Sequence, residues 1–232
     1  MKGSSLVSFI LLFAFFCCST SSEVKLSIQS YYPLRVGNYQ IYDVSQTTFN
    51  RLTCAETSQS VLTYQLKMVI TDSMANAEGG FTYVVHRYGR LDPTAAWTDS
   101  ATWTTRISNG SVINSENDVV FVKLVYPFST TAKWNGNLYN SLGYDSMKVK
   151  SIGQPYAVSS GNKFNNTVTV VQSDEKNFVY QDSRFEVYAN AVGLVYKSKV
   201  MLNYFTDAAC FTQLDIKTGV IYTQSLNSYG HQ

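Results

Sequence analysis

The sequence predicts an all-β fold, a single antiparallel sheet of about nine to eleven strands that is strongly curved or closed into a half-barrel or barrel. Aromatic side chains are plentiful, with 17 Tyr and 13 Phe, and they pack well on pleated, half-buried surfaces. Short apolar segments alternate at period two and are separated by turn residues at hairpin spacing. No window of about twelve residues keeps a helical period, and only residues 72–78 could form one short helix.

The low content of charged residues and the small net charge limit the kinds of partner that the protein can have. Charged residues make up 15% of the 232 residues, against roughly a quarter in an average soluble domain. The net charge is only +2 and no basic cluster stands out, so we expect no nucleic-acid partner. The length suits one all-β domain, since such domains reach roughly 200–250 residues.

The first residues have the features of an export signal. Lys2 is followed by an apolar run from Leu6 to Phe16, which is too short to span a bilayer as a helix. In one interpretation a lipoprotein signal peptidase cuts before Cys18, which then carries the lipid, because Cys17 is a suitably small preceding residue. In the other, an ordinary signal peptidase cuts among the small residues, for example after Ser21. A retained membrane anchor is the remaining alternative.

These features give the predicted domain organisation. Residues 1–18 form a signal peptide of the lipoprotein type, 19–30 a tether, 31–226 a single β domain and 227–232 a disordered tail. The expected location is the cell envelope, as an outer-membrane lipoprotein or in the periplasm, with secretion as the alternative.

The first strand is expected within residues 31–44. Pro33 holds the residue before it in an extended conformation, and Gly37 marks a turn. The apolar positions then change parity between Ile41 and Tyr42. This change predicts either a β-bulge or a strand that is apolar on both faces.

Residues 61–71 are the clearest half-buried strand, because their large apolar side chains fall on one face: Leu62, Tyr64, Leu66, Met68 and Ile70. A turn at residues 78–80 leads into a partner strand that runs from Phe81 to about Leu91. The two segments are expected to form an antiparallel pair.

The remaining strands follow at similar spacing. Residues 92–118 are rich in loops around one short strand. Residues 119–126 are apolar on both faces apart from Lys123, which predicts a central strand. Two further strands are expected around an acidic turn at residues 174–175, and a last hairpin around Gly219.

Two cysteines remain in the predicted domain, Cys54 and Cys210. In an exported protein such an isolated pair can form a disulfide, which would tie the first part of the domain to the last. For a loop of this length the chain-entropy estimate is about 5 kcal/mol, as an upper figure. The alternative is two free thiols, one of them buried.

Candidate catalytic and metal-binding residues are few. The chain has two histidines, of which His86 lies on the polar side of its strand and His231 lies in the predicted tail. No nucleophile elbow, zinc-protease helix or phosphate-binding loop occurs, and a zinc site of the Cys/His type has too few ligands. We therefore predict no catalytic residue, no metal site and no cofactor.

Carboxylates remain, and a glycosidase would need only two. Six fall at predicted loops or strand ends, and no pairing sets a catalytic one apart from a solvated one: Asp92, Asp99, Glu116, Asp118, Asp145 and Asp182. Three tryptophans could stack on sugars or line a lipid cavity, although aromatic side chains of β proteins more often fill the core: Trp97, Trp103 and Trp134.

Two short motifs bracket most of the predicted domain. The first is Tyr32-Pro33-Leu34-x-x-Gly37-Asn38-Tyr39-x-x-Tyr42, and the second is Val192-Gly193-Leu194-Val195-Tyr196-Lys197. Together they resemble the opening and closing segments of uncharacterised exported β-rich lipoproteins of Bacteroidota. The chain departs from that pattern with Gln40-Ile41 where Trp is common. The resemblance implies an all-β periplasmic or surface lipoprotein, and it implies no activity, cofactor or catalytic residue.

The sequence favours a non-catalytic role over an enzyme. In this hypothesis a membrane-tethered β domain, anchored through a lipid on Cys18, holds an apolar ligand or an envelope protein in a concave aromatic surface. The alternative is an exported hydrolase that uses loop carboxylates on polysaccharide or peptide. A purely structural envelope component is a third hypothesis.

Overall fold

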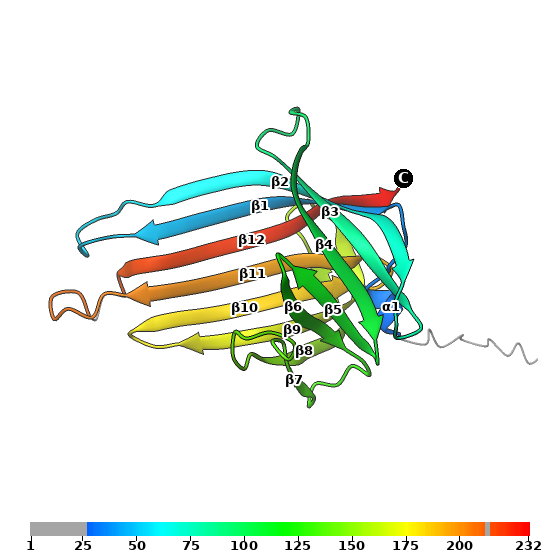
Figure 1. Cartoon of the computed structure of the whole chain (residues 1–232). Coiled ribbons are helices and arrows are strands. Elements are labelled where there is room, and N and C mark those ends of the chain that lie inside the picture. The colour runs from blue at the N-terminus through cyan, green and yellow to red at the C-terminus, as the bar shows by residue number, and fades with distance from the viewer. Residues whose placement is uncertain (1–26, 212–213) are drawn as a thin grey trace, which may run out of the picture.

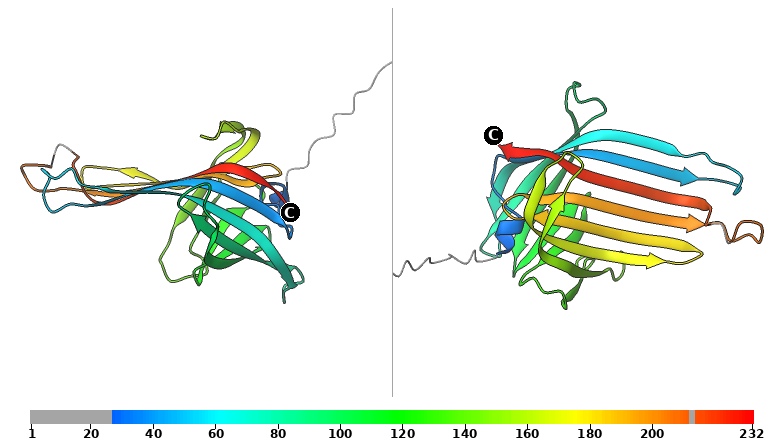
Figure 2. Two further views of the ribbon diagram at one scale, coloured as in Figure 1. Left: turned by 90° about the horizontal axis from the view of Figure 1, so that it is seen from above. Right: turned by 180° about the vertical axis from the view of Figure 1, so that it is seen from behind.

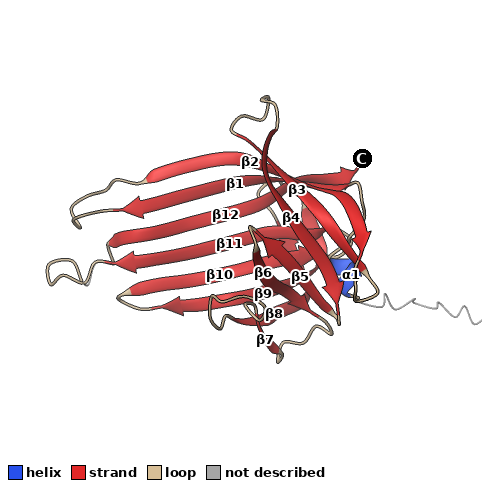
Figure 3. Cartoon of the chain, in the orientation of Figure 1, coloured by secondary structure: helices blue, strands red, loops and turns tan. Residues whose placement is uncertain are grey.

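The computed structural model describes residues 27–211 and 214–232 (Figure 1). These residues form twelve strands in one sheet and a single short helix (Figure 3). The all-β class is confirmed, with slightly more strands than the nine to eleven expected. The elements are α1 (Ile28–Tyr31), β1 (Asn38–Asn50), β2 (Ser60–Ala75), β3 (Phe81–Arg90), β4 (Thr98–Ser108), β5 (Ser111–Glu116), β6 (Val119–Val125), β7 (Lys133–Asn135), β8 (Ser146–Ala157), β9 (Lys163–Lys176), β10 (Tyr180–Ala189), β11 (Gly193–Tyr204) and β12 (Ile216–His231).

Every neighbouring pair in the sheet is antiparallel, and the strand order is β6-β5-β4-β3-β2-β1-β12-β11-β10-β9-β8-β7. The chain is therefore an up-and-down meander whose first and last strands pair at the centre of the sheet. Such local hairpin connections suit a chain with a turn signal every ten residues or so.

The sheet has two parts of different shape. At one end β3 to β6 curl over the other strands and form a half-barrel, which we call the barrel end (Figure 1). The long strands β1, β2 and β9 to β12 continue beyond it, and we call their far ends the platform. Seen edge-on, the platform is one thin layer of strands (Figure 2, left).

The two edge strands of the sheet meet at the barrel end. The backbone N–H of Val122 in β6 donates to the carbonyl of Gly136, just after β7, at 2.8 Å. The side-chain amide of Asn140 donates to the carbonyl of Val120 at 2.7 Å. The prediction that residues 119–126 form a central strand was wrong, because β6 is an edge strand. This contact covers part of the β6 edge that would otherwise face water.

The start of the domain contains the only helix of the described residues. Ser27 caps α1, because its hydroxyl accepts a hydrogen bond from the backbone N–H of Ser30. Pro33 follows one residue after the helix and stops it. The helix lies where the sequence predicted a tether over 19–30, while residues 72–78, the predicted helix, are strand and turn.

The predicted irregularity at Ile41 and Tyr42 is confirmed as a β-bulge. Ile41 pairs with Ser228 of β12 and Tyr42 pairs with Leu226, so Asn227 is the extra residue. The β8–β9 hairpin lies over this bulge, since the amide of Asn162 donates to the carbonyl of Asn227 at 3.0 Å. The β8–β9 hairpin therefore helps to hold the bulge in place.

The C-terminal strand runs further in both directions than expected. Gly219 lies inside β12 rather than at a hairpin turn, because a Cβ there would stand 2.2 Å from the carbonyl oxygen of Met201 in β11. Glycine here permits close approach of two strands. Residues 228–231 pair with β1, where the sequence predicted a disordered tail over 227–232, and a ring nitrogen of His231 lies 3.2 Å from Asn38 Oδ1.

Candidate functional site

The predicted site residues fall into three groups. Cys18, the predicted lipid attachment site, lies outside the described residues, as do the signal and most of the tether. Cys54 and Cys210 lie together as a disulfide, with Cα atoms 6.2 Å apart, in loops at the tip of the platform (Figure 1). Their oxidation in the exported protein stays a prediction.

The six candidate carboxylates do not form one site. Asp145 and Asp182 both bind Arg184, whose guanidinium donates to them at 3.0 Å and 2.7 Å. Asp92 accepts hydrogen bonds within its own loop from Thr94, and these lower the pKa of its carboxyl. Only Glu116 of the six lines the main cavity.

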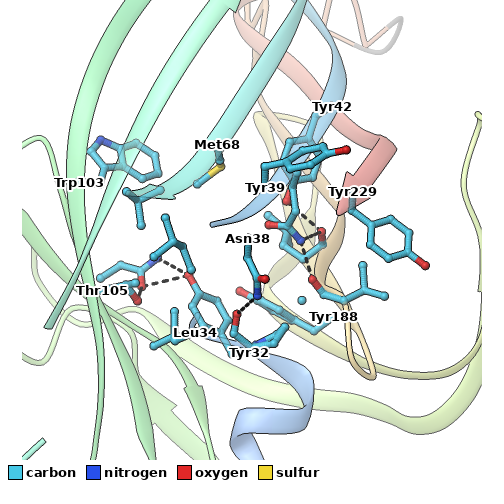
Figure 4. A pocket seen from close by; sticks show the side chains of 18 of the residues that line it. Tyr32, Leu34, Asn38, Tyr39, Tyr42, Met68, Trp103, Thr105, Tyr188 and Tyr229 are labelled. Carbon is cyan, nitrogen blue, oxygen red and sulfur yellow. Dashed lines mark hydrogen bonds between the residues drawn. The ribbon is translucent and has the colours of Figure 1, made fainter. Parts of the chain in front are cut away.

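That cavity lies inside the barrel end and has a volume of about 320 Å³, within the range of small-molecule sites. Figure 4 shows Met68 and Trp103 on one side, Tyr39 and Tyr229 on the other, and Tyr32 and Leu34 from the chain segment after α1. The cross-strand register places three lining residues on one face of the sheet: Gln40 of β1 pairs with Met68 of β2, and Met68 with Arg87 of β3. Partners directly opposite in a sheet share a face.

A cluster of four charges forms one wall. The ammonium of Lys123 lies 2.7 Å from Glu186 Oε1 and 3.9 Å from Glu116 Oε1. Lys197, directly opposite Glu186 in the sheet, lies 3.2 Å from the same oxygen. The Tyr188 hydroxyl donates to the other oxygen of Glu186. The side chain of Glu186 is only 1% exposed, so these partners replace the water that it has lost.

Local irregularities aim this cluster inward. Ile113 pairs with Val122 and Val112 pairs with Leu124, which leaves Lys123 as the extra residue of a bulge in β6. Bulges commonly re-aim a side chain near a site. The bulge explains how Lys123 can be buried in a strand that is apolar on both faces.

The charged groups of the cluster stabilise one another in their ionised forms. Burial alone would raise the pKa of Glu186, but the ammonium groups of Lys123 and Lys197 outweigh it and lower that pKa to about 2. Burial likewise opposes the charged form of Lys123, yet Glu186 and Glu116 raise the pKa of its ammonium above the ordinary value. Glu186 therefore stays ionised near neutral pH and cannot serve as the general acid that glycoside hydrolysis needs.

A second polar chain crosses the cavity wall beside the charges. Asn114 Oδ1 accepts from the hydroxyl of Thr105 at 2.6 Å and from that of Tyr32 at 3.2 Å. Its amide donates to Glu116 at 3.3 Å, which connects this chain to the charged cluster. The polar groups of this wall are thus paired with protein partners, as buried polar groups must be.

Arg87 differs from the other cations of the cavity. Its guanidinium carbon lies 3.8 Å from the centre of the Trp103 ring, a close cation–π contact. Its Nε atom is buried and has no hydrogen-bond partner, and none of the described residues forms an ion pair with it. Burial lowers the pKa of this guanidinium, although arginine stays charged in proteins.

The three tryptophans have separate roles. Trp103 lines the cavity, whereas Trp97 carries the guanidinium of Arg90 at 4.1 Å outside it. Trp134 packs at the edge where the sheet ends meet, and its ring N–H donates to the carbonyl of Val122. Of the three, Trp103 alone belongs to the cavity.

Sequence reasoning missed most of the charged wall. Lys123 was noted only as an exception in an apolar strand, while Glu186, Lys197 and Arg87 were not singled out. A usable signal exists for one of them, since Glu186 stands between Phe185 and Val187 in a strand that ends in buried residues. A charge in such a setting calls for a partner from elsewhere in the chain.

The described residues contain neither a cluster of metal-binding side chains nor a membrane-spanning helix. No group of three or more His, Cys, Asp and Glu side chains there could hold a metal ion. Among the same residues no helix has the length and apolar character needed to cross a membrane.

Comparison with known proteins gives only distant structural likeness. No family model matches the sequence, and no curated protein matches it. One similar solved structure is a suspected exported protein with a YmcC-like fold from Bacteroides fragilis, with a TM-score of 0.43, 11% identity, and 84% of this chain and 96% of that chain covered. Another is a suspected lipoprotein from Parabacteroides distasonis, with a TM-score of 0.45, 8% identity, and 86% and 98% covered.

Proposed function

We propose that the chain is an exported, non-catalytic binding protein that holds an amphipathic small molecule inside its barrel end. One observation carries this proposal: side chains do not fill the interior of the barrel end, which keeps a half-open cavity of about 320 Å³. The walls combine apolar and aromatic side chains with a few polar groups, which is the composition of small-molecule sites.

The ionisation and pairing of the polar groups in the cavity favour a binding role over catalysis. Catalysis by acid and base needs a group whose proton can leave or arrive near neutral pH. Glu186 is held ionised by Lys123 and Lys197, and Asn114 is committed to Thr105 and Tyr32. Such a network fixes the shape of the cavity and leaves no free acid–base pair in it.

A ligand can reach the cavity from the end of the sheet where β1 begins and β12 finishes. The lining includes Tyr229, which is 47% exposed, and His231, which is exposed as well. Pro33 and Leu34, a few residues after α1, line the same region. The cavity therefore opens on the side of the molecule where α1 lies (Figure 1).

This placement gives the proposed membrane tether a purpose. A lipid on Cys18 would lie about ten residues before α1, a reach of roughly 30 Å when extended. The cavity mouth would then face the membrane, from which an amphipathic molecule could enter. In this proposal the tether is a lipid anchor in the outer membrane, and release into the periplasm is the alternative location.

Binding can be tested with a neutral apolar probe, so that charge plays no part. We expect the full chain to bind N-phenyl-1-naphthylamine with a rise in its fluorescence, and dodecanol to displace the probe. Met68→Trp fills the cavity and should weaken probe binding at least tenfold, because the wall at Met68 lies against the space the probe would occupy.

The control is the same substitution on the platform. Met201 is 39% exposed and lies outside the cavity lining, so Met201→Trp should leave probe binding unchanged. Circular dichroism of both variants checks that they fold. A wild-type chain that does not bind the probe, or equal binding by the two variants, would refute the proposal.

A further inference from the structure

The cavity contains one positive charge that the protein leaves without an opposite charge. Arg87 projects from β3 into the lining, and its buried Nε has no hydrogen-bond partner. A guanidinium presents five N–H donors in a plane, and a buried donor without a partner costs stability. A protein keeps such a group where something outside the chain satisfies it.

The other cations of the lining have partners within the chain. Lys123 and Lys197 both contact Glu186, and Lys123 also approaches Glu116. Glu116 is the remaining carboxylate of the lining; it accepts from Asn114 and lies 3.9 Å from Lys123, and it forms no ion pair with Arg87.

The charged side chains of the lining also leave one positive charge unbalanced. They are three cations, Arg87, Lys123 and Lys197, and two carboxylates, Glu116 and Glu186. Three positive charges against two negative ones leave one positive charge in a half-open cavity. A single anionic group would neutralise it.

The aromatic neighbour of Arg87 prepares the guanidinium for this role. Trp103 covers one face of the guanidinium plane at 3.8 Å, which holds the plane in place. A fixed guanidinium edge matches the two oxygens of a carboxylate or a phosphate, which it binds through paired hydrogen bonds.

We propose that the cavity ligand is an amphiphile with one carboxylate or phosphate group, and that Arg87 binds this group. This inference rests on the proposed binding function and names the class of its ligand. The apolar part of the molecule lies against Met68, Ile70 and Val85, which line the cavity on β2 and β3 next to Arg87.

The test compares three probes that share one alkyl chain: dodecanoate, dodecyl phosphate and dodecanol. Titration calorimetry on the full chain should show that at least one of the two anions binds tenfold or more tightly than dodecanol. The relative affinities of dodecanoate and dodecyl phosphate then distinguish a fatty-acid ligand from a phosphate-bearing one.

Two arginine variants isolate the guanidinium. Arg87→Met keeps an apolar stem against Trp103 and should lower the affinity for the preferred anion at least tenfold, with dodecanol binding unchanged. Arg90→Met is the matched control, because Arg90 lies on the same strand, contacts Trp97 and donates to Gln65 outside the cavity. It should leave all three affinities as in the wild type.

The outcomes separate this inference from the function on which it rests. Equal binding of the anions and dodecanol by the wild type would overturn the role of Arg87, while binding itself would still stand. Failure of N-phenyl-1-naphthylamine and all three alkyl probes to bind would overturn both. Since the wild-type preference is decisive alone, the inference stays testable even where Arg87→Met does not fold.

Discussion

The barrel end and the platform are built from the same strands but hold together differently. Along β2 the large apolar residues alternate without interruption, yet Leu66 at the barrel end is 1% exposed and Leu62 on the platform is 46% exposed. Leu66 packs in a core cluster with residues of β1 and β9 to β12, whereas the platform is one thin layer of strands (Figure 2, left).

Alternation of apolar and polar residues along a strand predicts which face of the sheet a side chain lies on. It does not predict what covers that face. At the barrel end the covered face forms a core and a cavity with a buried charge network. On the platform the same face carries partly exposed side chains, and the strands depend on their neighbours in one layer. The forces that stabilise the two ends should therefore be separable by mutation.

The largest effect is expected from the disulfide, which joins two platform loops. Replacing both cysteines, Cys54→Ser with Cys210→Ser, should lower the free energy of unfolding by up to about 5 kcal/mol, because the open unfolded chain gains entropy. Urea unfolding followed by tryptophan fluorescence measures the loss.

The matched control is the wild-type chain in dithiothreitol, which should show the same loss if reduction is complete. The double variant should be insensitive to the reductant. A wild-type chain whose stability does not respond to reduction would mean that these two cysteines are not bonded in solution.

The next effect is expected from the buried charge network of the barrel end. Glu186→Gln keeps the side-chain shape but leaves Lys123 buried with only Glu116, at 3.9 Å, to balance it. Removing one partner of a buried ion pair costs about 3–5 kcal/mol, since the other charge stays buried. Urea unfolding again supplies the measurement.

The platform supplies the comparison for this substitution. Asp182→Asn removes one carboxylate from Arg184, whose side chain is 21% exposed and keeps Asp145 as a partner. The loss should stay below about 1 kcal/mol, as for partly exposed pairs. Similar losses in the two variants would contradict the view that burial distinguishes the two ends.

A smaller effect is expected from deleting apolar groups on β2. Leu66→Ala should cost about 3 kcal/mol, because it leaves a cavity in a packed core. Leu62→Ala on the same face of the same strand should cost less than about 1 kcal/mol, since its side chain is already half in water. Equal costs would show that the platform is covered in solution, for example by a second molecule.

Much of the fold could be predicted because hairpins are local. The alternation of residues 61–71 and the turn at residues 78–80 depend on neighbours in sequence, and both are confirmed. The bulge opposite Ile41 and Tyr42 depends on the pairing with β12, where Asn227 is the extra residue. The edge position of β6 could not be predicted in this way. It depends on a contact between Val122 and Gly136 that only the curvature of the whole sheet creates.

The cavity was less accessible to sequence reasoning for the same reason. Lys123, Glu186 and Arg87 come from three strands that lie far apart in the sequence, so no local pattern brings them together. Only the curvature of the sheet places them around one cavity. The hypothesis of a concave aromatic surface did not identify the charged side chains that line the cavity.

The smallest effect is a pH dependence that should belong to the barrel end alone. Because the pKa of Glu186 is lowered to about 2 in the folded chain, its contribution is present above its ordinary pKa and is lost as the pH falls. Between pH 5 and pH 3 the wild type should lose about 2 kcal/mol that Glu186→Gln does not lose. Asp182→Asn should follow the wild-type curve, since it leaves the buried network intact. Parallel curves for the wild type and Glu186→Gln would mean that Glu186 titrates normally and that its lysine partners do not hold its charge.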